Sequence, residues 1–165
     1  MPPTLNEPLS LEIFEQIKSK AGAPFDNTHR AVLTLTGATY VQGFVVLNNG
    51  QYEPIEHAWI ELGEDIIDPT LPHINKARQE IYYFPAQSLS IKALKASIEE
   101  AREDYPDDPP LPIYGAPPYE YYGDVMLGGK DYVNASQAAE SKSRELKAAR
   151  AECKQKRIDN AESAN

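Results

Sequence analysis

A histidine and an aspartate, His57 and Asp68, are the residues whose types and spacing best suit chemistry. They lie in two apolar stretches, residues 52–62 and 65–68, which Gly63-Glu64 separates. If these stretches pair as antiparallel strands around that turn, His57 becomes a diagonal neighbour of Asp68 on one face of the sheet. A carboxylate in that place orients an imidazole and favours its protonated form, as in the base-and-orienter half of a nucleophilic triad. A His–Asp pair that only stabilises the hairpin is the alternative interpretation.

Several further elements must position this pair. Residues 40–47 are dense in β-branched and aromatic side chains and predict a buried strand, and Asn48-Asn49-Gly50 predicts a tight hairpin turn after it. Helices are predicted over residues 9–20 with Ser10 as cap, from Asn27 to Gly37, and after a Ser88 cap to about Glu103. Residues 71–79 are expected to form a loop, and residues 80–84 a short strand. The predicted fold class is α+β, a small antiparallel sheet of three to five strands packed on one side by these helices.

The C-terminal third has a different composition. Residues 105–122 hold six prolines and five tyrosines, which predicts a polyproline strap with its tyrosines against the body. Residues 135–158 predict a charged helix with thin apolar content, and Gly128-Gly129-Lys130 is interpreted as a turn. The sequence therefore divides into a core at residues 1–104, an acidic Pro/Tyr-rich strap or linker at 105–134 and a charged helical tail at 135–165.

Composition excludes several classes of protein. The chain has 165 residues and a net charge of −9, and an acidic surface argues against a primary nucleic-acid binder. It has one cysteine, Cys153, which excludes an intramolecular disulfide and a cysteine-based zinc site. No apolar run approaches the roughly 18 residues that a membrane span needs, and the first residues lack the pattern of a secretory signal. His29, His57 and His73 have no zinc-site spacing, so no metal or cofactor is expected, and the expected location is the cytoplasm of the producing cell or of a host.

The motifs around the hairpin resemble a known family. His57-Ala58-Trp59 on one strand, followed by Asp68-Pro69-Thr70 at the end of the next, is similar to the transglutaminase-like branch of the papain-like cysteine hydrolases. The stretches 40–44 and 81–84 also resemble small bacterial and phage members. The resemblance implies His57 as general base and Asp68 as its orienting carboxylate. It also implies a binding cleft, for which we single out the motif residues Asn27, Tyr40, Trp59 and Tyr83.

The nucleophile that the resemblance implies is missing. Similar members carry a cysteine, an aromatic residue, any residue and an asparagine upstream of the hairpin, and the corresponding stretch here is Pro24-Phe25-Asp26-Asn27. Pro24 stands at the cysteine position, and residues 21–39 contain no cysteine. Thr28 lacks the free N-terminal amine on which a threonine nucleophile relies, and Cys153 is distant in the charged helix. Without a thiolate, His57 has nothing to activate.

The sequence therefore predicts a catalytically inactive transglutaminase-like domain that binds another protein, with the strap and the C-terminal helix as contact elements. One alternative is an active hydrolase or acyltransferase that uses His57 and Asp68 with an unidentified nucleophile. Another is an inhibitor from a phage or mobile element that acts as an acidic decoy.

Overall fold

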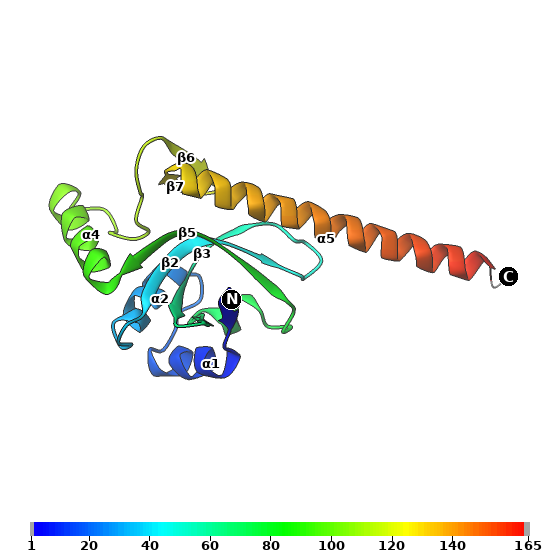
Figure 1. Cartoon of the computed structure of the whole chain (residues 1–165), viewed down its shortest axis with the longest axis horizontal. Coiled ribbons are helices and arrows are strands. Elements are labelled where there is room, and N and C mark those ends of the chain that lie inside the picture. Colours follow the sequence, from blue (N-terminus) through cyan, green and yellow to red (C-terminus); the bar gives the residue numbers. More distant parts are fainter. Residues whose placement is uncertain (1, 164–165) are drawn as a thin grey trace.

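The computed structural model describes residues 2–163 and has the α+β class that the sequence predicts (Figure 1). Five strands form one sheet in the order β1-β4-β3-β2-β5. Their bounds are Thr4–Leu5 for β1, Thr39–Leu47 for β2, Ile55–Leu62 for β3, Asp65–Ile67 for β4 and Ile81–Ser90 for β5. The predicted sheet was wholly antiparallel. The observed sheet is mixed, because the short β1, which has no strand pattern of its own, adds in parallel to β4.

The hairpin of β3 and β4 has the predicted register. Leu62 pairs with Asp65 across the Gly63-Glu64 turn, and Ile60 pairs with Ile67. The β2–β3 connection is a loop over residues 48–54 rather than the predicted tight turn at Asn48-Asn49-Gly50, and β3 begins at Ile55 rather than at Tyr52. On its other side β2 pairs with β5 through a bulge at Gly43, where a Cβ atom would clash with the Phe84 carbonyl oxygen. This close approach explains why glycine occupies that position.

Four helices surround the sheet at shifted positions. They are α1 (Glu7–Gln16), α2 (Pro24–Val32), α3 (Leu71–Ile74) and α4 (Ile91–Asp104). The cap of α1 is Asn6, which accepts a hydrogen bond from Leu9 N at 3.0 Å, and not Ser10, which is buried inside the first turn. Helix α2 starts with Pro24, a residue favoured in the first turn, and ends before Gly37. Ser90 rather than Ser88 caps α4, because pairing with β2 extends β5 through Ser88.

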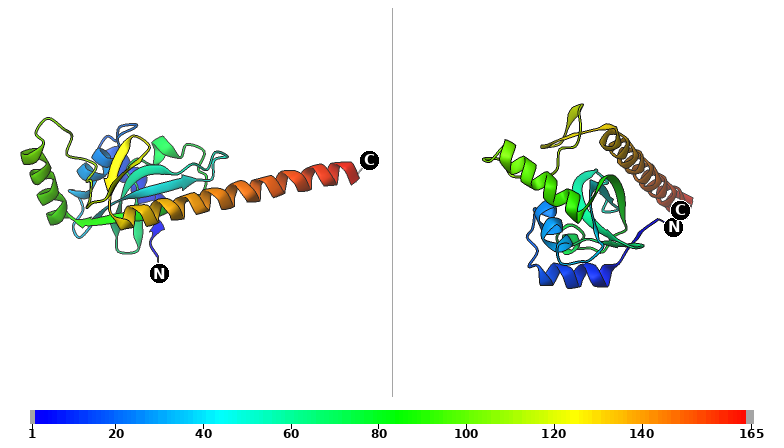
Figure 2. Two further views of the ribbon diagram at one scale, coloured as in Figure 1. Left: turned by 90° about the horizontal axis from the view of Figure 1, so that it is seen from above. Right: turned by 60° about the vertical axis from the view of Figure 1, so that its left-hand side comes forward.

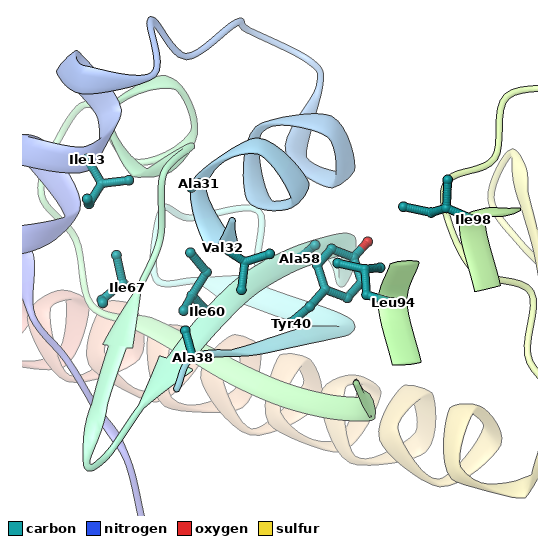
Figure 3. Close-up of a cluster of buried hydrophobic side chains, with 10 residues drawn as sticks. All are labelled: Ile13, Ala31, Val32, Ala38, Tyr40, Ala58, Ile60, Ile67, Leu94 and Ile98. Atoms are coloured by element: carbon teal, nitrogen blue, oxygen red, sulfur yellow. The ribbon is translucent and has the colours of Figure 1, made fainter. Parts of the chain in front are cut away.

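The helices α1, α2 and α4 share an apolar core with one face of the sheet (Figure 3). Tyr40, Ala58 and Ile60 supply the sheet side of this core. Further along the same strand face, Phe44 and Val46 pack against α5 (Lys130–Ser163) in a second core. The view down the sheet in Figure 2 shows the curled strands with the helices around them. The opposite strand face carries Val41, Val45, Trp59 and Ile66 in a third core.

The strap does not rest on its tyrosines as predicted. Tyr105, Tyr114, Tyr119 and Tyr121 are 44–73% exposed, and Tyr122 alone of the five packs against a core. Leu111 and Ile113 instead anchor the strap on the first core. The chain then forms a hairpin of β6 (Tyr119–Tyr122) and β7 (Val125–Gly128) before α5 begins.

Helix α5 is longer than predicted and has two parts. Its first part docks on the body through Tyr132, Ala135, Ala139 and Ser143, all of which are buried. From Lys147 to Ser163 every residue is exposed, and the helix projects away from the body (Figure 1). Within residues 2–163, no helix has the length and apolarity to cross a membrane.

Candidate functional site

His57 and Asp68 meet as the hairpin geometry predicts. The imidazole Nε2 of His57 lies 2.8 Å from Asp68 Oδ2, and because a carboxylate only accepts, Nε2 carries the proton. Their side chains are 1% and 0% exposed. Side chains alternate between the two faces of the sheet along β3 and β4. The register of this hairpin places both His57 and Asp68 on the strand face opposite α2 and α4.

Asp68 has more partners than a triad carboxylate needs. Its Oδ2 also accepts a hydrogen bond from the Tyr83 hydroxyl at 2.9 Å, and its Oδ1 accepts one from Thr70 N at 3.0 Å. The backbone N–H of Asp68 donates to Ser10 Oγ at 2.9 Å. One residue therefore joins β3, β5, α1 and the turn before α3. Burial and the nearby Asp68 carboxylate raise the pKa of Tyr83 well above its usual value, so this phenol is a fixed donor at neutral pH.

Aromatic rings enclose the pair. Trp59 stacks beside His57 with a centroid distance of 6.4 Å, and Tyr83 meets Trp59 edge-on at 5.0 Å. Trp59 is fully buried. A cavity of about 440 Å³ opens between β1 and β5, and Tyr83 lies in its wall. Neither His57 nor Asp68 lines this cavity, whereas Tyr83, which bonds to Asp68, does.

Asn27, predicted as a site residue, reaches Asp68 only indirectly. Its amide Nδ2 donates to Thr70 Oγ1 at 3.1 Å and to the Lys20 carbonyl at 2.8 Å. Its Oδ1 accepts from Lys20 N and from Arg30 Nη2. Asn27 thus fixes the turn that leads into α2 and ties it to the Asp68-Pro69-Thr70 segment. Pro24, at the start of α2, has neither a side-chain donor nor an acceptor for chemistry.

Tyr40 does not join the site. Its side chain lies on the other strand face, in the first core, and its hydroxyl donates to Gln42 Oε1 at 2.8 Å. The structure therefore brings together His57, Asp68, Trp59 and Tyr83, links Asn27 through Thr70 and leaves Tyr40 apart.

Two other potential nucleophiles, Thr28 and Cys153, make no hydrogen bond to His57 in the described part of the chain. Thr28 is buried on α2, and its Oγ1 makes no hydrogen bond within residues 2–163. Cys153, the single thiol of the sequence, is exposed on the projecting part of α5. Residues 2–163 also contain no group of three or more histidine, cysteine, aspartate or glutamate side chains that could hold a metal ion.

Three residues of the buried polar network, Ser10, Gln42 and Thr70, were not predicted as site residues from the sequence. Ser10 and Thr70 bind Asp68, and Gln42 bonds to Tyr132 and Ile113. The Asp-Pro-Thr turn carried a signal for Thr70, because aspartate side chains commonly accept from the backbone two residues on. Ser10 and Gln42 gave no local signal for these contacts, since Asp68 lies 58 residues from Ser10 and Tyr132 lies 90 residues from Gln42.

Comparison with protein-family models, curated proteins and solved structures finds no match for this chain. The resemblance carried by the His-Ala-Trp and Asp-Pro-Thr motifs therefore stays a prediction.

Proposed function

We propose that the chain is a catalytically inactive, transglutaminase-like domain that works by binding another protein. The observation that carries this proposal is the burial of the His57–Asp68 pair. Both side chains are buried, and Asp68 accepts hydrogen bonds from Tyr83 and Thr70 as well as from His57. A general base must reach the proton that it abstracts. The side chain of His57 is 1% exposed and has no thiol beside it in the described chain, which suits a structural role.

The projecting part of α5 supports the binding role. An isolated helix gains little stability from propensity alone, and most helices in proteins are stabilised by packing. Residues 147–163 are all exposed, and only Lys147 and Arg150 at the start of this segment touch the body, at the β2–β3 loop, within the described residues. A partner that covers it would supply the missing contacts.

The catalytic half of the proposal is tested with peptide, amide and ester substrates. We expect the parent chain and His57→Gln to give the same background rate. A rate above background that His57→Gln abolishes, while the variant keeps the parent circular dichroism spectrum, would establish the alternative of an active hydrolase with an unidentified nucleophile.

The binding half is tested by capture from the natural host with two forms of the chain. The full chain is compared with a form that ends at Ala148, which keeps the docked part of α5 and Tyr132. A deletion from Ala135 would remove buried residues and expose the second core, so it is unsuitable. We expect specific capture by the full chain and its loss in the shortened form. Equal capture by both forms would exclude the projecting part of α5 as the contact element.

A further inference from the structure

The face of α5 that docks on the body changes from apolar to basic side chains where the helix leaves the body. Side chains three and four residues apart share one face of a helix. On α5 this face begins as Tyr132, Ala135, Ala139 and Leu146, which pack on the sheet. The same face continues as Arg150, Cys153, Lys154 and Arg157. An apolar stripe therefore becomes a cationic stripe, which we call the basic face: Arg150, Lys154 and Arg157.

The body ends beneath the start of this basic face. Lys147 Nζ binds Glu53 Oε1 at 2.6 Å, and the guanidinium of Arg150 lies directly against Gly50. Both contacts are with the β2–β3 loop. Beyond this loop, Lys154 and Arg157 have no ion pair within residues 2–163. The acidic residues Glu145, Glu152 and Asp159 recur every seven residues on the far side of the helix, where Lys156 also lies, so the basic face itself carries no acidic side chain.

A groove of opposite charge lies at the other end of the molecule. It has a volume of about 380 Å³ between α4 and the strap, and its wall includes Glu100, Asp104 and Asp108. The rings of Tyr105 and Tyr114, which are 66% and 44% exposed, line the same groove. Carboxylates bind guanidinium and ammonium groups, and aromatic faces attract them further. This groove, the acidic groove, suits a cationic side chain.

Gln87 adds an unused hydrogen-bond acceptor at this groove. Its side chain lines the groove, and its Oε1 is buried without a hydrogen-bond donor from residues 2–163. Buried polar atoms are normally paired, so this unpaired acceptor leaves the wall of the groove incompletely satisfied in the free chain.

We propose that the basic face of α5 docks in the acidic groove of a second copy of this chain. The repeat distances agree: Arg150 and Lys154 are one helical turn apart, as are Glu100 and Asp104 on α4. The contact cannot form within one molecule, because α4 and the C-terminal end of α5 lie at opposite ends of its long axis (Figure 1). A reciprocal contact gives a two-fold dimer, and a one-way contact gives a head-to-tail chain.

This inference rests on the proposed binding role of α5 and names its partner. Association is measured by sedimentation velocity of the full chain at about 10 mM and about 1 M salt, where the screening length is roughly 30 Å and 3 Å. We expect dimers or longer chains at low salt and a dissociation constant at least tenfold higher at high salt. A monomer at every concentration in low salt would overturn the inference.

Charge reversal supplies matched variants. Lys154→Glu/Arg157→Glu on the basic face and Glu100→Lys/Asp104→Lys in the groove should each abolish association. A mixture of these two variants should restore it, because each surface then meets its complement. The controls make the same charge changes on other faces, as Arg144→Glu/Lys156→Glu and Glu99→Lys/Glu103→Lys, and should associate as the parent does. Failure of the mixture to associate, or equal loss in the controls, would refute this pairing.

The two proposals fail in different ways. If the chain is monomeric but Lys154→Glu/Arg157→Glu still loses capture of a host protein, the second-copy inference falls and the proposed function stands. If the chain is monomeric and the form ending at Ala148 captures as well as the full chain, both fall. Binding of a duplex oligonucleotide by the monomeric chain, lost in Lys154→Glu/Arg157→Glu, would assign the basic face to nucleic acid instead.

Discussion

Asp68 holds the buried polar network of the sheet together. It accepts hydrogen bonds from His57, Tyr83 and Thr70, and all of these groups lose their partner when the carboxylate is removed. Each buried donor left without an acceptor costs about 1–3 kcal/mol of stability, and three donors share this carboxylate.

We therefore expect Asp68→Ala to lower the free energy of unfolding by about 3–5 kcal/mol. Asp68→Asn, which keeps one acceptor oxygen, should lose roughly half as much. Urea unfolding followed by circular dichroism measures both. His57→Gln serves as the comparison, because it removes one partner and leaves two. A loss below about 1 kcal/mol for Asp68→Ala would show that Asp68 does not organise the site.

Thr28 carries a buried hydroxyl that could be mistaken for a nucleophile. It lies one turn after Pro24, where the family resemblance implies a nucleophile, but its Oγ1 is buried without a partner in the described chain. An unpaired buried hydroxyl is destabilising, and valine has almost the same shape. We expect Thr28→Val to raise the free energy of unfolding by about 1 kcal/mol, measured in urea. A loss of stability would mean that Oγ1 finds a partner in solution.

At the scale of elements, Gln42 connects the sheet, the strap and α5. Its Oε1 accepts from Tyr40 and Ile113 N, each at 2.8 Å, and its Nε2 donates to the Ile113 carbonyl at 3.0 Å and to the Tyr132 hydroxyl at 2.5 Å. All four hydrogen-bonding positions of the amide are filled. The strap is thus held by one side chain as well as by the packing of Leu111.

We expect Gln42→Ala to release the strap. Limited proteolysis should cleave within residues 105–118 at least tenfold faster than in the parent, and the free energy of unfolding should fall by about 2–4 kcal/mol. Gln87→Ala is the matched control, because Gln87 Oε1 also lies beside the strap, at Gly115, without a bonding partner. Equal cleavage of Gln42→Ala and the parent would show that Leu111 and Ile113 hold the strap alone.

The elements that the sequence predicts well are those whose structure depends on residues close to them in the chain. The register of β3 and β4, and with it the His57–Asp68 contact, follows from strand alternation and one turn. The features whose positions were predicted wrongly depend on residues distant in the chain. Pairing with β2 extends β5, so the cap of α4 is Ser90 and not Ser88. The docking of α5 includes contacts such as that of Tyr132 with Gln42, 90 residues apart, which a helical pattern cannot reveal.

At the scale of the whole molecule, charge is arranged along the long axis. The net charge is −9, yet residues 147–157 carry five basic side chains and one acidic one. The acidic groove lies at α4, away from this segment (Figure 1). Net charge keeps copies apart, whereas this separation favours end-to-end contact at low ionic strength. The balance between the two sets the salt dependence of any self-association.

The tyrosines report on the integrity of the entire fold. Burial raises the pKa of Tyr40, Tyr83 and Tyr132, and the neighbouring Asp68 carboxylate raises that of Tyr83 further. These three hydroxyls lie in the first core, the His57–Asp68 site and the α5 interface. An unfolded tyrosine has a pKa of about 10. The folded chain therefore holds these protons more tightly, so their contribution to stability is complete below about pH 10 and is lost as pH rises above it.

We expect at least three of the ten tyrosines to stay protonated until the chain unfolds in alkali. The phenolate absorbance of the folded chain should fall short of that in urea by at least three groups, and the missing rise should coincide with loss of circular dichroism. Tyr83→Phe should reduce the coincident rise by one group, because it removes one buried proton. Full ionisation of all ten tyrosines while the circular dichroism is unchanged would contradict the burial of these three hydroxyls, and with it the enclosed site around Asp68.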